Sequence, residues 1–416
     1  MSDFTFLHKA VRAGDAIRVK KLMHMGGQSI ISPCGKFSLF HAAAQSGHTN
    51  VIKSLSYSKD FVNYKGKNGV TPMLIAAGEG HVGAIKALYS LGASVNTPKK
   101  DGVTPVFIAA QNGHADAIRA LAALGANINT PDKYGFTPVL IAAGHGHVEA
   151  IKALCTLGAV RDHKNGSSPV FVAAGNGKVD AVIALVELGT NANAQERDGS
   201  TPVLTAAWNG HIETITVLAS IGANINTPKH DGGTPVQVAA QNNHVGVIKV
   251  LSDLGADVNA PSRDGGTPVW VAAQHGHVGV ITGLSALGAN INTPNNRGVT
   301  PVYIAAQNGH ADAIRALSAL GADVNTPDED GVTPLIIAAQ SCQVGAMKTL
   351  QKIRAAMGPT TLGKDRECIC CGRSTNRLFL RGGYERVRYC SRECQTIAHM
   401  KHRNECKTPV LKNVVY

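Results

Sequence analysis

A Thr-Pro pair recurs along most of this chain of 416 residues, usually at intervals of 33 residues. The threonines of these pairs are Thr71, Thr104, Thr137, Thr201, Thr234, Thr267, Thr300 and Thr333. Ser168 takes the same place once, at the one interval that is two residues shorter. A fixed period of this length indicates a stacked array of small units, because a single unit cannot bury its apolar side chains alone.

Residues 101–133 illustrate how one unit is expected to fold. Thr104 is predicted to cap a short first helix, whose first position is proline. Gly113 is expected to end that helix in a left-handed conformation. Apolar residues at helical spacing then predict a second helix over 115–124, and a hairpin-like loop leads to the next unit. Each unit is therefore predicted to be a helix pair with a hairpin loop.

The shared pattern Asp-Gly-x-Thr-Pro-x-x-x-Ala-Ala-x-x-Gly-His, with Gly-Ala-x-x-Asn behind it, resembles the ankyrin repeat. The resemblance covers nine units over residues 67–354 and implies an all-α repeat solenoid, a stack of helix-turn-helix units with hairpin loops. Residues 1–66 are interpreted as two divergent units of the same outline, as expected for units at the end of a stack. In the last unit Cys342 replaces the helix-ending glycine, which predicts a less regular cap.

One position after the Thr-Pro pair varies while its surroundings repeat. Ankyrin repeats usually have histidine there, whereas this chain has Leu74, Phe107, Leu140, Phe171, Leu204, Gln237, Trp270, Tyr303 and Ile336. The hydrogen bonds of the usual histidine to the turn are therefore expected to be absent in these units. The variation makes Phe107, Gln237, Trp270 and Tyr303 candidates for partner recognition, although packing could account for about half of the series.

A histidine follows the first helix in eight units, which suggests either a row of metal ligands or a structural role. These residues are His48, His81, His114, His147, His211, His244, His277 and His310. Packed helices lie about 8–10 Å apart, whereas zinc–nitrogen bonds need about 2 Å. Successive histidines cannot share an ion, so the row is interpreted as structural, with side chains bonding the neighbouring loop.

Basic residues occupy the loop tips of seven units. They are Lys67, Lys100, Lys133, Lys164, Arg197, His230 and Arg263, and the series then changes to Asn296 and Glu329. One interpretation is an acidic partner that lies along the tips. The other is a set of solvated tips, balanced by the adjacent Asp101, Asp198, Asp231 and Asp264.

Six of the nine cysteines lie within residues 368–406, behind a linker over 355–366. A Cys-x-x-Cys pair and a Cys-x-x-x-Cys pair supply four thiolates, the set that closes a tetrahedral structural zinc site. A segment of this size has too little core to fold unaided, and zinc binding would supply the stability. The predicted metal ligands are Cys368, Cys371, Cys390 and Cys394, with His402 and Cys406 available for a second ion.

The sequence pattern of this segment resembles the MYND zinc finger. Its parts are Cys-x-x-Cys-Gly, Val-x-Tyr-Cys-Ser-x-x-Cys-Gln and His-x-x-x-Cys. That resemblance implies two zinc ions, but the missing half of the second set would fall on Arg381 and Tyr384, so one tight zinc ion is expected. Fingers of this type bind proline-containing peptides. Gln395 matches the family, whereas His399 replaces the usual tryptophan, which implies an altered groove. Residues 407–416 are interpreted as a tail.

The lysines and arginines are unevenly distributed. Residues 1–70 have 10 Lys or Arg against 3 Asp or Glu, residues 71–350 have 16 against 20, and residues 351–416 have 14 against 5. The basic C-terminal part makes a nucleic-acid-associated regulatory factor the alternative function. Nucleic acid is nevertheless not the expected partner, because zinc-bound thiolates would cancel part of this charge.

The chain has no Gly-rich phosphate loop, nucleophile elbow or HExxH motif. A non-enzymatic scaffold is therefore predicted, with the ankyrin surface binding one protein and the finger another. No apolar run is long enough to span a membrane, and charges near the N-terminus argue against a secretion signal. Clustered cysteines are typical of metal binding in a reducing compartment, so a cytoplasmic or nuclear location is expected.

Overall fold

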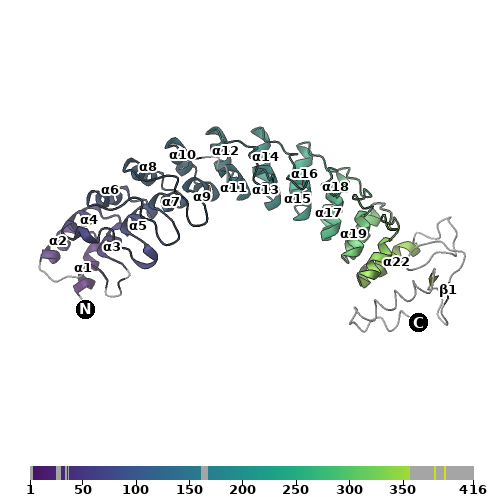
Figure 1. The fold of residues 1–416 in the computed structure, drawn as a ribbon, viewed down its shortest axis with the longest axis horizontal. Helices are drawn as coiled ribbons and strands as arrows, with labels where there is room; N and C mark the ends of the chain where they lie inside the picture. Colours follow the sequence, from purple (N-terminus) through teal and green to yellow (C-terminus); the bar gives the residue numbers. More distant parts are fainter. Residues whose placement is uncertain are drawn as a thin grey trace. The chain divides into compact units, whose positions relative to one another are not determined.

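The computed structural model describes residues 3–24, 30–32, 35, 37–160, 167–356, 379–380 and 388–389. Within these residues the chain forms eleven consecutive helix pairs (Figure 1). The first helices of the pairs are α1 (Asp3–Arg12), α3 (Leu39–Gln45), α5 (Pro72–Gly78), α7 (Pro105–Gln111), α9 (Pro138–His145), α11 (Pro169–Gly175), α13 (Pro202–Asn209), α15 (Pro235–Gln241), α17 (Pro268–His275), α19 (Pro301–Gln307) and α21 (Pro334–Gln340). The second helices are α2 (Ala16–His24), α4 (Thr49–Ser54), α6 (Val82–Ser90), α8 (Ala115–Ala123), α10 (Val148–Thr156), α12 (Val179–Glu187), α14 (Ile212–Ser220), α16 (Val245–Asp253), α18 (Val278–Ala286), α20 (Ala311–Ala319) and α22 (Val344–Ala356).

Two 3₁₀ helices and two short strands complete the described elements. The 3₁₀ helices are η1 (Ser56–Phe61) and η2 (Lys67–Gly69), and the strands are β1 (Phe379–Leu380) and β2 (Arg388–Tyr389). The strands pair antiparallel, with Phe379 opposite Tyr389. No helix among the described residues is both long and apolar enough to cross a membrane.

The chain divides into two compact units, each of which is a two-layered stack. The first comprises Met1–Arg197, Thr201–Ala206 and Thr216–Ala223, and the second comprises Asp198–Ser200, Ala207–Ile215 and Asn224–Tyr416. In the first unit α3, α5, α7, α9 and α11 pack in sequence order as one layer, and α4, α6, α8, α10 and α12 as the other. In the second unit the layers are α15, α17, α19 and α21, and α16, α18, α20 and α22.

The predicted helix boundaries are confirmed to within one residue in the unit at 101–133. The Thr104 hydroxyl accepts a hydrogen bond from the Phe107 amide at 3.2 Å, Pro105 occupies the first turn, and Gly113 has a φ of 82°. The same cap is made in seven other units, by Thr71, Ser168, Thr201, Thr234, Thr267, Thr300 and Thr333. The cap satisfies a backbone N–H that the first turn of a helix leaves without a partner.

Small and branched apolar residues divide the core between the two layers. The first helices contribute alanine pairs such as Ala109 and Ala110, and the second helices contribute leucines such as Leu121, all with no exposed surface. Alanine lets neighbouring first helices approach closely, while each buried leucine contributes about 1.5–3 kcal/mol. Cys155 in α10 is 7% exposed and packs as a small buried residue.

Six histidines of the row each link a unit to the one before it, as predicted. The ring Nε2 atom bonds a backbone carbonyl of the preceding unit, in the pairs His48–Arg12, His81–Gln45, His147–Gln111, His244–Trp208, His277–Gln241 and His310–Gln274, at 3.0–3.2 Å. For five of these six histidines, all except His277, the ring also lies against the helix-ending glycine of the preceding unit; Asn243, with a φ of 62°, takes the glycine position in the unit before His277. A Cβ added to Gly113, for example, would lie 2.8 Å from the Nδ1 atom of His147. These glycines are therefore required both for their positive φ and for this close approach.

The last helix pair keeps the regular outline, apart from one backbone strain. Cys342 has a φ of 56°, where the equivalent glycines have similar angles at no steric cost. Thr333 still caps α21, and α22 extends over 13 residues, whereas α20 has nine. The irregularity predicted for this cap is therefore confined to Cys342 and the longer second helix.

Candidate functional site

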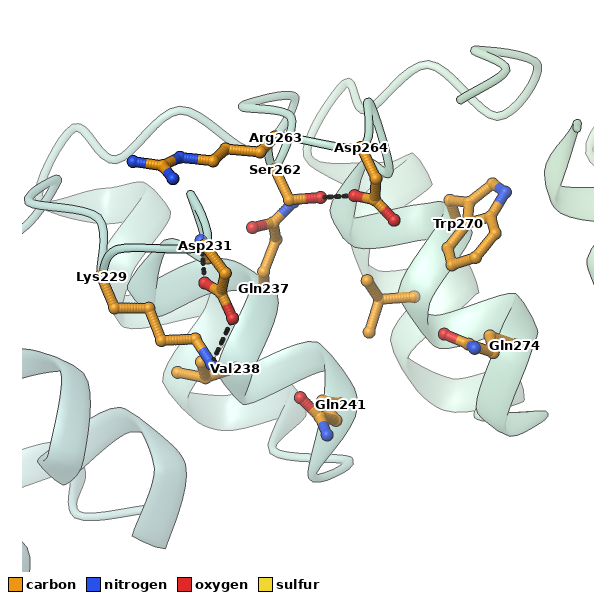
Figure 2. Close-up of a pocket in the computed structure, with 12 residues that line it drawn as sticks. Lys229, Asp231, Gln237, Val238, Gln241, Ser262, Arg263, Asp264, Trp270 and Gln274 are labelled. Carbon is orange, nitrogen blue, oxygen red and sulfur yellow. Dashed lines mark hydrogen bonds and ion pairs between the residues drawn. The ribbon is translucent and has the colours of Figure 1, made fainter. Parts of the chain in front are cut away.

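A groove of about 530 Å³ lies between two adjacent helix pairs of the second compact unit (Figure 2). Its lining residues come from two loop tips and from the first helices α15 and α17. They are Lys229, Asp231, Gly233, Gln237, Val238, Gln241, Ser262, Arg263, Asp264, Trp270, Val271 and Gln274.

The carboxylates on the loop side of the groove accept hydrogen bonds within their own loops, and one of them also forms an ion pair. Asp231 accepts a hydrogen bond from the Gly233 amide at 2.8 Å and pairs with the Lys229 ammonium at 2.7 Å. Burial opposes ionisation of Asp231, but the hydrogen bond from Lys229 and the Gly233 amide outweigh it and lower the pKa of this carboxyl. Asp264 accepts a hydrogen bond from the Ser262 hydroxyl at 2.5 Å.

Arg263 is the cation of the groove without a charged partner. Its side chain is exposed, extends from the loop above Lys229 and Asp231 (Figure 2), and forms no ion pair with any residue that the structure describes. Its backbone amide is fixed by a hydrogen bond to the Asp231 carbonyl at 3.1 Å. The backbone of Arg263 is therefore fixed at the rim, and its exposed guanidinium has donors available.

Gln237 and Trp270 form fixed walls. The Gln237 side chain accepts from the Thr234 amide at 3.0 Å and donates to the Gly266 carbonyl at 2.5 Å. The Trp270 indole N–H donates to the Val299 carbonyl at 2.9 Å. Both acceptors lie 29 residues further along the chain, in the loop of the next unit.

These bonds correct one expectation from the sequence. Replacement of the usual histidine was expected to remove the hydrogen bond to the turn, but Gln237 and Trp270 donate to the position that His41 uses when its Nε2 bonds the Val70 carbonyl at 3.0 Å. Tyr303 instead donates to the Asp328 carboxylate at 2.9 Å. Amide, indole and phenol groups can each replace imidazole as the donor because all carry an N–H or O–H at similar reach.

The four residues proposed for partner recognition are mostly buried. Phe107, Gln237, Trp270 and Tyr303 have 3%, 4%, 8% and 5% of their surface exposed, respectively. Only Gln237 and Trp270 belong to the groove. Contact of these side chains with a partner stays a prediction, and the structure gives all four a packing role.

Two glutamines that the sequence did not single out supply the free polar groups of the groove. Gln241 ends α15 and Gln274 lies near the end of α17, and neither side-chain amide bonds another described residue. Val238 and Val271 lie beside them in the lining. An amide with a free donor and a free acceptor suits the backbone of an extended peptide. The sequence signal that could have identified them is the variation at this position between units. Its residues are Gly78, Gln111, Gly144, Gly175, Trp208, Gln241, Gln274, Gln307 and Gln340.

The predicted zinc ligands lie outside the described residues. They are Cys368, Cys371, Cys390, Cys394, His402 and Cys406, and the same holds for Gln395 and His399. Across the part of the chain that the structure does describe, no three His, Cys, Asp or Glu side chains are grouped so that they could hold a metal ion.

Comparison with known families places this fold. The family model described as "Ankyrin repeats (3 copies)" matches residues 7–99, 91–163, 157–229, 221–295 and 280–357. The chain therefore belongs to the ankyrin-repeat proteins, a family whose fold is generally a non-enzymatic interaction module.

A solved structure and the curated sequences add little to this assignment. The crystal structure of the human ASB11 ankyrin repeat domain is 25% identical, with a TM-score of 0.48, over 52% of this chain and 98% of that chain. A comparison with curated proteins gave no match.

Proposed function

We propose that this protein is a non-enzymatic scaffold whose groove at α15 and α17 binds an extended segment of a protein partner. The observation that carries the proposal is the set of unused groups around the groove, namely the amides of Gln241 and Gln274 and the guanidinium of Arg263. Hydrogen bonds from such side chains fix a peptide, while the fixed Trp270 wall and the valines supply apolar surface.

A triple variant tests the groove. Gln241→Ala, Gln274→Ala and Arg263→Ala together should remove at least one protein from the set captured by the full chain, because the donors that fix the peptide are lost. The matched control is Gln111→Ala, Gln307→Ala and Arg297→Ala, which makes the same chemical change outside the groove. Quantitative mass spectrometry of both captures checks it, and an equal yield of every partner from the two variants would refute the groove as a binding site.

We further infer that the cysteine-rich segment holds one tight zinc ion through Cys368, Cys371, Cys390 and Cys394. The spacing of two cysteine pairs supports this ligand set, and the short β1–β2 hairpin ends one residue before Cys390. The four cysteines would form a closed structural zinc site, in which the ion stabilises the fold and takes no part in catalysis. Metal analysis after mild chelation should give one zinc per chain and none for Cys368→Ser, and two retained ions would contradict the proposal.

The resemblance to MYND fingers supports a second partner for this segment. A proline-containing peptide would bind the finger near Gln395 and His399, in a groove altered by the loss of the usual tryptophan. His402 and Cys406 are proposed to contribute half of a second, weaker zinc site. The reduced cysteines that zinc binding needs favour a cytoplasmic or nuclear location.

A nucleic-acid-associated role is the second candidate. It is favoured by the 14 basic against 5 acidic residues of 351–416. Such binding would weaken steeply as salt rises, because cations that contact phosphates release counterions. A titration with a labelled oligonucleotide at increasing salt checks it, and an absent or salt-independent signal removes this candidate.

A further inference from the structure

Three consecutive loop tips of the first compact unit are held in register by backbone hydrogen bonds. The Lys100 amide donates to the Asn68 carbonyl, and the Lys133 amide donates to the Asp101 carbonyl, both at 2.9 Å. Each tip is closed by its own turn, as in the bond from the Asp132 amide to the Phe136 carbonyl at 2.9 Å. The three tips are therefore stacked, although the first differs in its turn, where Asn68 has a φ of 59°.

The lysines at these tips are exposed and unpaired. Lys67, Lys100 and Lys133 form no ion pair with any residue in the described part of the chain. Of the neighbouring carboxylates, Asp101 pairs instead with Lys99 at 3.0 Å, and Asp132 accepts the amides of Tyr134 and Phe136, each at 2.9 Å. The acids adjacent to the tips therefore leave these three ammonium groups available.

Taken together, these three tips carry an excess of positive charge. Residues 63–70, 96–103 and 129–136 together contain five lysines and two aspartates. Arg263, further along the chain, lies beside Asp264, and the tip at 325–332 carries three carboxylates and no basic residue. An acidic ligand would be attracted to the first tips and repelled by the last.

Exposed aromatic rings lie at the third of these tips. Tyr134 is 72% exposed and Phe136 is 43% exposed, at the third tip. The Lys133 ammonium lies 4.7 Å from the centre of the Tyr134 ring, a cation–π contact that holds the ring beside the charge. Exposed tyrosine beside a cation is typical of the residues that anchor protein partners.

We propose that the loop tips at Lys67, Lys100 and Lys133 bind an extended acidic segment of a partner protein. Packed helices lie about 8–10 Å apart, and an extended segment in the polyproline II conformation advances about 3.1 Å per residue with three residues per turn. Carboxylates at every third position would therefore share one face, and each would meet one lysine per unit. An apolar residue at one end of the segment would contact Tyr134 and Phe136.

The spacing favours a peptide over a nucleic acid. A strand of duplex DNA carries one charge about every 3.4 Å, roughly three times as dense as one lysine per unit. The tips lie in the first compact unit and the groove at α15 and α17 lies in the second, so the two surfaces can be tested separately.

The test uses the full chain and a fluorescein-labelled peptide in which glutamate occupies every third position, with a leucine at one end. Fluorescence anisotropy at low salt should give an affinity that falls about tenfold in the combined variant Lys67→Glu, Lys100→Glu and Lys133→Glu, since each reversal turns attraction into repulsion. The matched control is Lys53→Glu, Lys86→Glu and Lys249→Glu, which alters the net charge equally at exposed positions on second helices. The control should change the affinity less than about threefold, because surface charges away from the contact are screened by salt.

A second variant separates the aromatic anchor from the charge. Tyr134→Ser should weaken binding about threefold and leave its salt dependence unchanged, since it removes contact area and no charge. Three results would overturn the proposal: no peptide binding by the unaltered chain, equal weakening by the tip and control variants, or tighter lysine-dependent binding of a single-stranded oligonucleotide than of the peptide. The last result would assign these tips to nucleic acid.

Discussion

At the scale of the residue, one position of the repeat, that of His41, can bond the loop of the next repeat through its side chain. His41 shows this best, because its Nδ1 accepts from the Ser38 amide at 3.0 Å while its Nε2 bonds the Val70 carbonyl at 3.0 Å. Gln237 makes the same two contacts with an amide. The neutral form of His41, protonated on Nε2, is the form that satisfies both partners.

Acid should therefore lower the free energy of unfolding of the first compact unit through protonation of His41. Burial lowers the pKa of His41 below its ordinary 6.5, although the bond to Val70 partly opposes the shift. The unfolded chain then binds the proton more strongly, so the free energy of unfolding is fully retained above pH 6.5 and falls as the pH drops below it. Denaturant unfolding at neutral and at mildly acidic pH measures this slope.

Two substitutions at His41 separate its bonds from its titration. His41→Gln should keep the stability of the neutral protein and flatten the acid slope, because glutamine makes the same bonds and does not titrate. His41→Leu should cost about 1–3 kcal/mol at neutral pH by leaving the buried Ser38 amide unpaired, while the Val70 carbonyl keeps only its bond from the Gly66 amide. His8 and His275 also have a pKa lowered by burial and would leave a residual slope. An unaltered slope in His41→Gln would exclude His41 as the source.

At the scale of the element, a glycine ends a helix in two different surroundings. Gly113 ends α7 with a φ of 82°, and the ring of His147 lies directly against it. Gly125 follows α8 with a φ of 86°, and no atom lies within 4 Å of the position that its Cβ would take. The backbone strain of an alanine is the same at both sites, but only the first has a neighbour to displace.

Alanine at these two glycines should therefore have unequal effects. Gly125→Ala should cost about 1–2 kcal/mol, the penalty of a left-handed L-residue. Gly113→Ala should cost at least about 1 kcal/mol more, because His147 must shift and weaken its bond to the Gln111 carbonyl. The free energies of unfolding of the two variants give the comparison. Equal losses would show that the histidine ring adapts without cost.

At the scale of the whole molecule, neighbouring helix pairs within each compact unit contact one another, so that stability is distributed locally. The second helix α10 packs against α8 and α12, whereas α22 packs on α20 and has no following repeat among the described residues. Leu154 in α10 and Leu350 in α22 are equivalent positions, and both have no exposed surface. The same truncation should therefore act differently at the two positions.

Leucine-to-alanine substitutions test this local stability. Each should cost about 2–5 kcal/mol at its own site. Leu350→Ala should accelerate amide hydrogen exchange mainly in residues 333–356, because an end unit can open alone. Leu154→Ala should accelerate exchange in the units on both sides of α10, since each loses an ordered neighbour. Faster exchange spread evenly over all units in both variants would contradict a nearest-neighbour stack.

The sequence by itself determined the features that depend on neighbouring residues. The Thr104 cap, the left-handed Gly113 and the two helices of each unit follow from contacts within a few positions, which a repeat spells out many times. The histidine row was also correctly assigned, because spacing alone excluded a shared metal ion. The zinc ligands rest on spacing too, and they stay a prediction because Cys368 and its partners lie outside the described residues.

Only the tertiary structure decided which side chains are used internally and which are free. Trp270 and Gln237 looked like partner-binding residues, but their polar atoms bond carbonyls 29 residues away. The side-chain amides of Gln241 and Gln274 bond no other described residue, and the lysines of the first tips form no ion pair with described residues because Lys99 and the loop amides satisfy the neighbouring carboxylates. A repeated sequence makes these positions look alike, and they differ because pairing across stacked units depends on the reach and chemistry of side chains about one repeat apart.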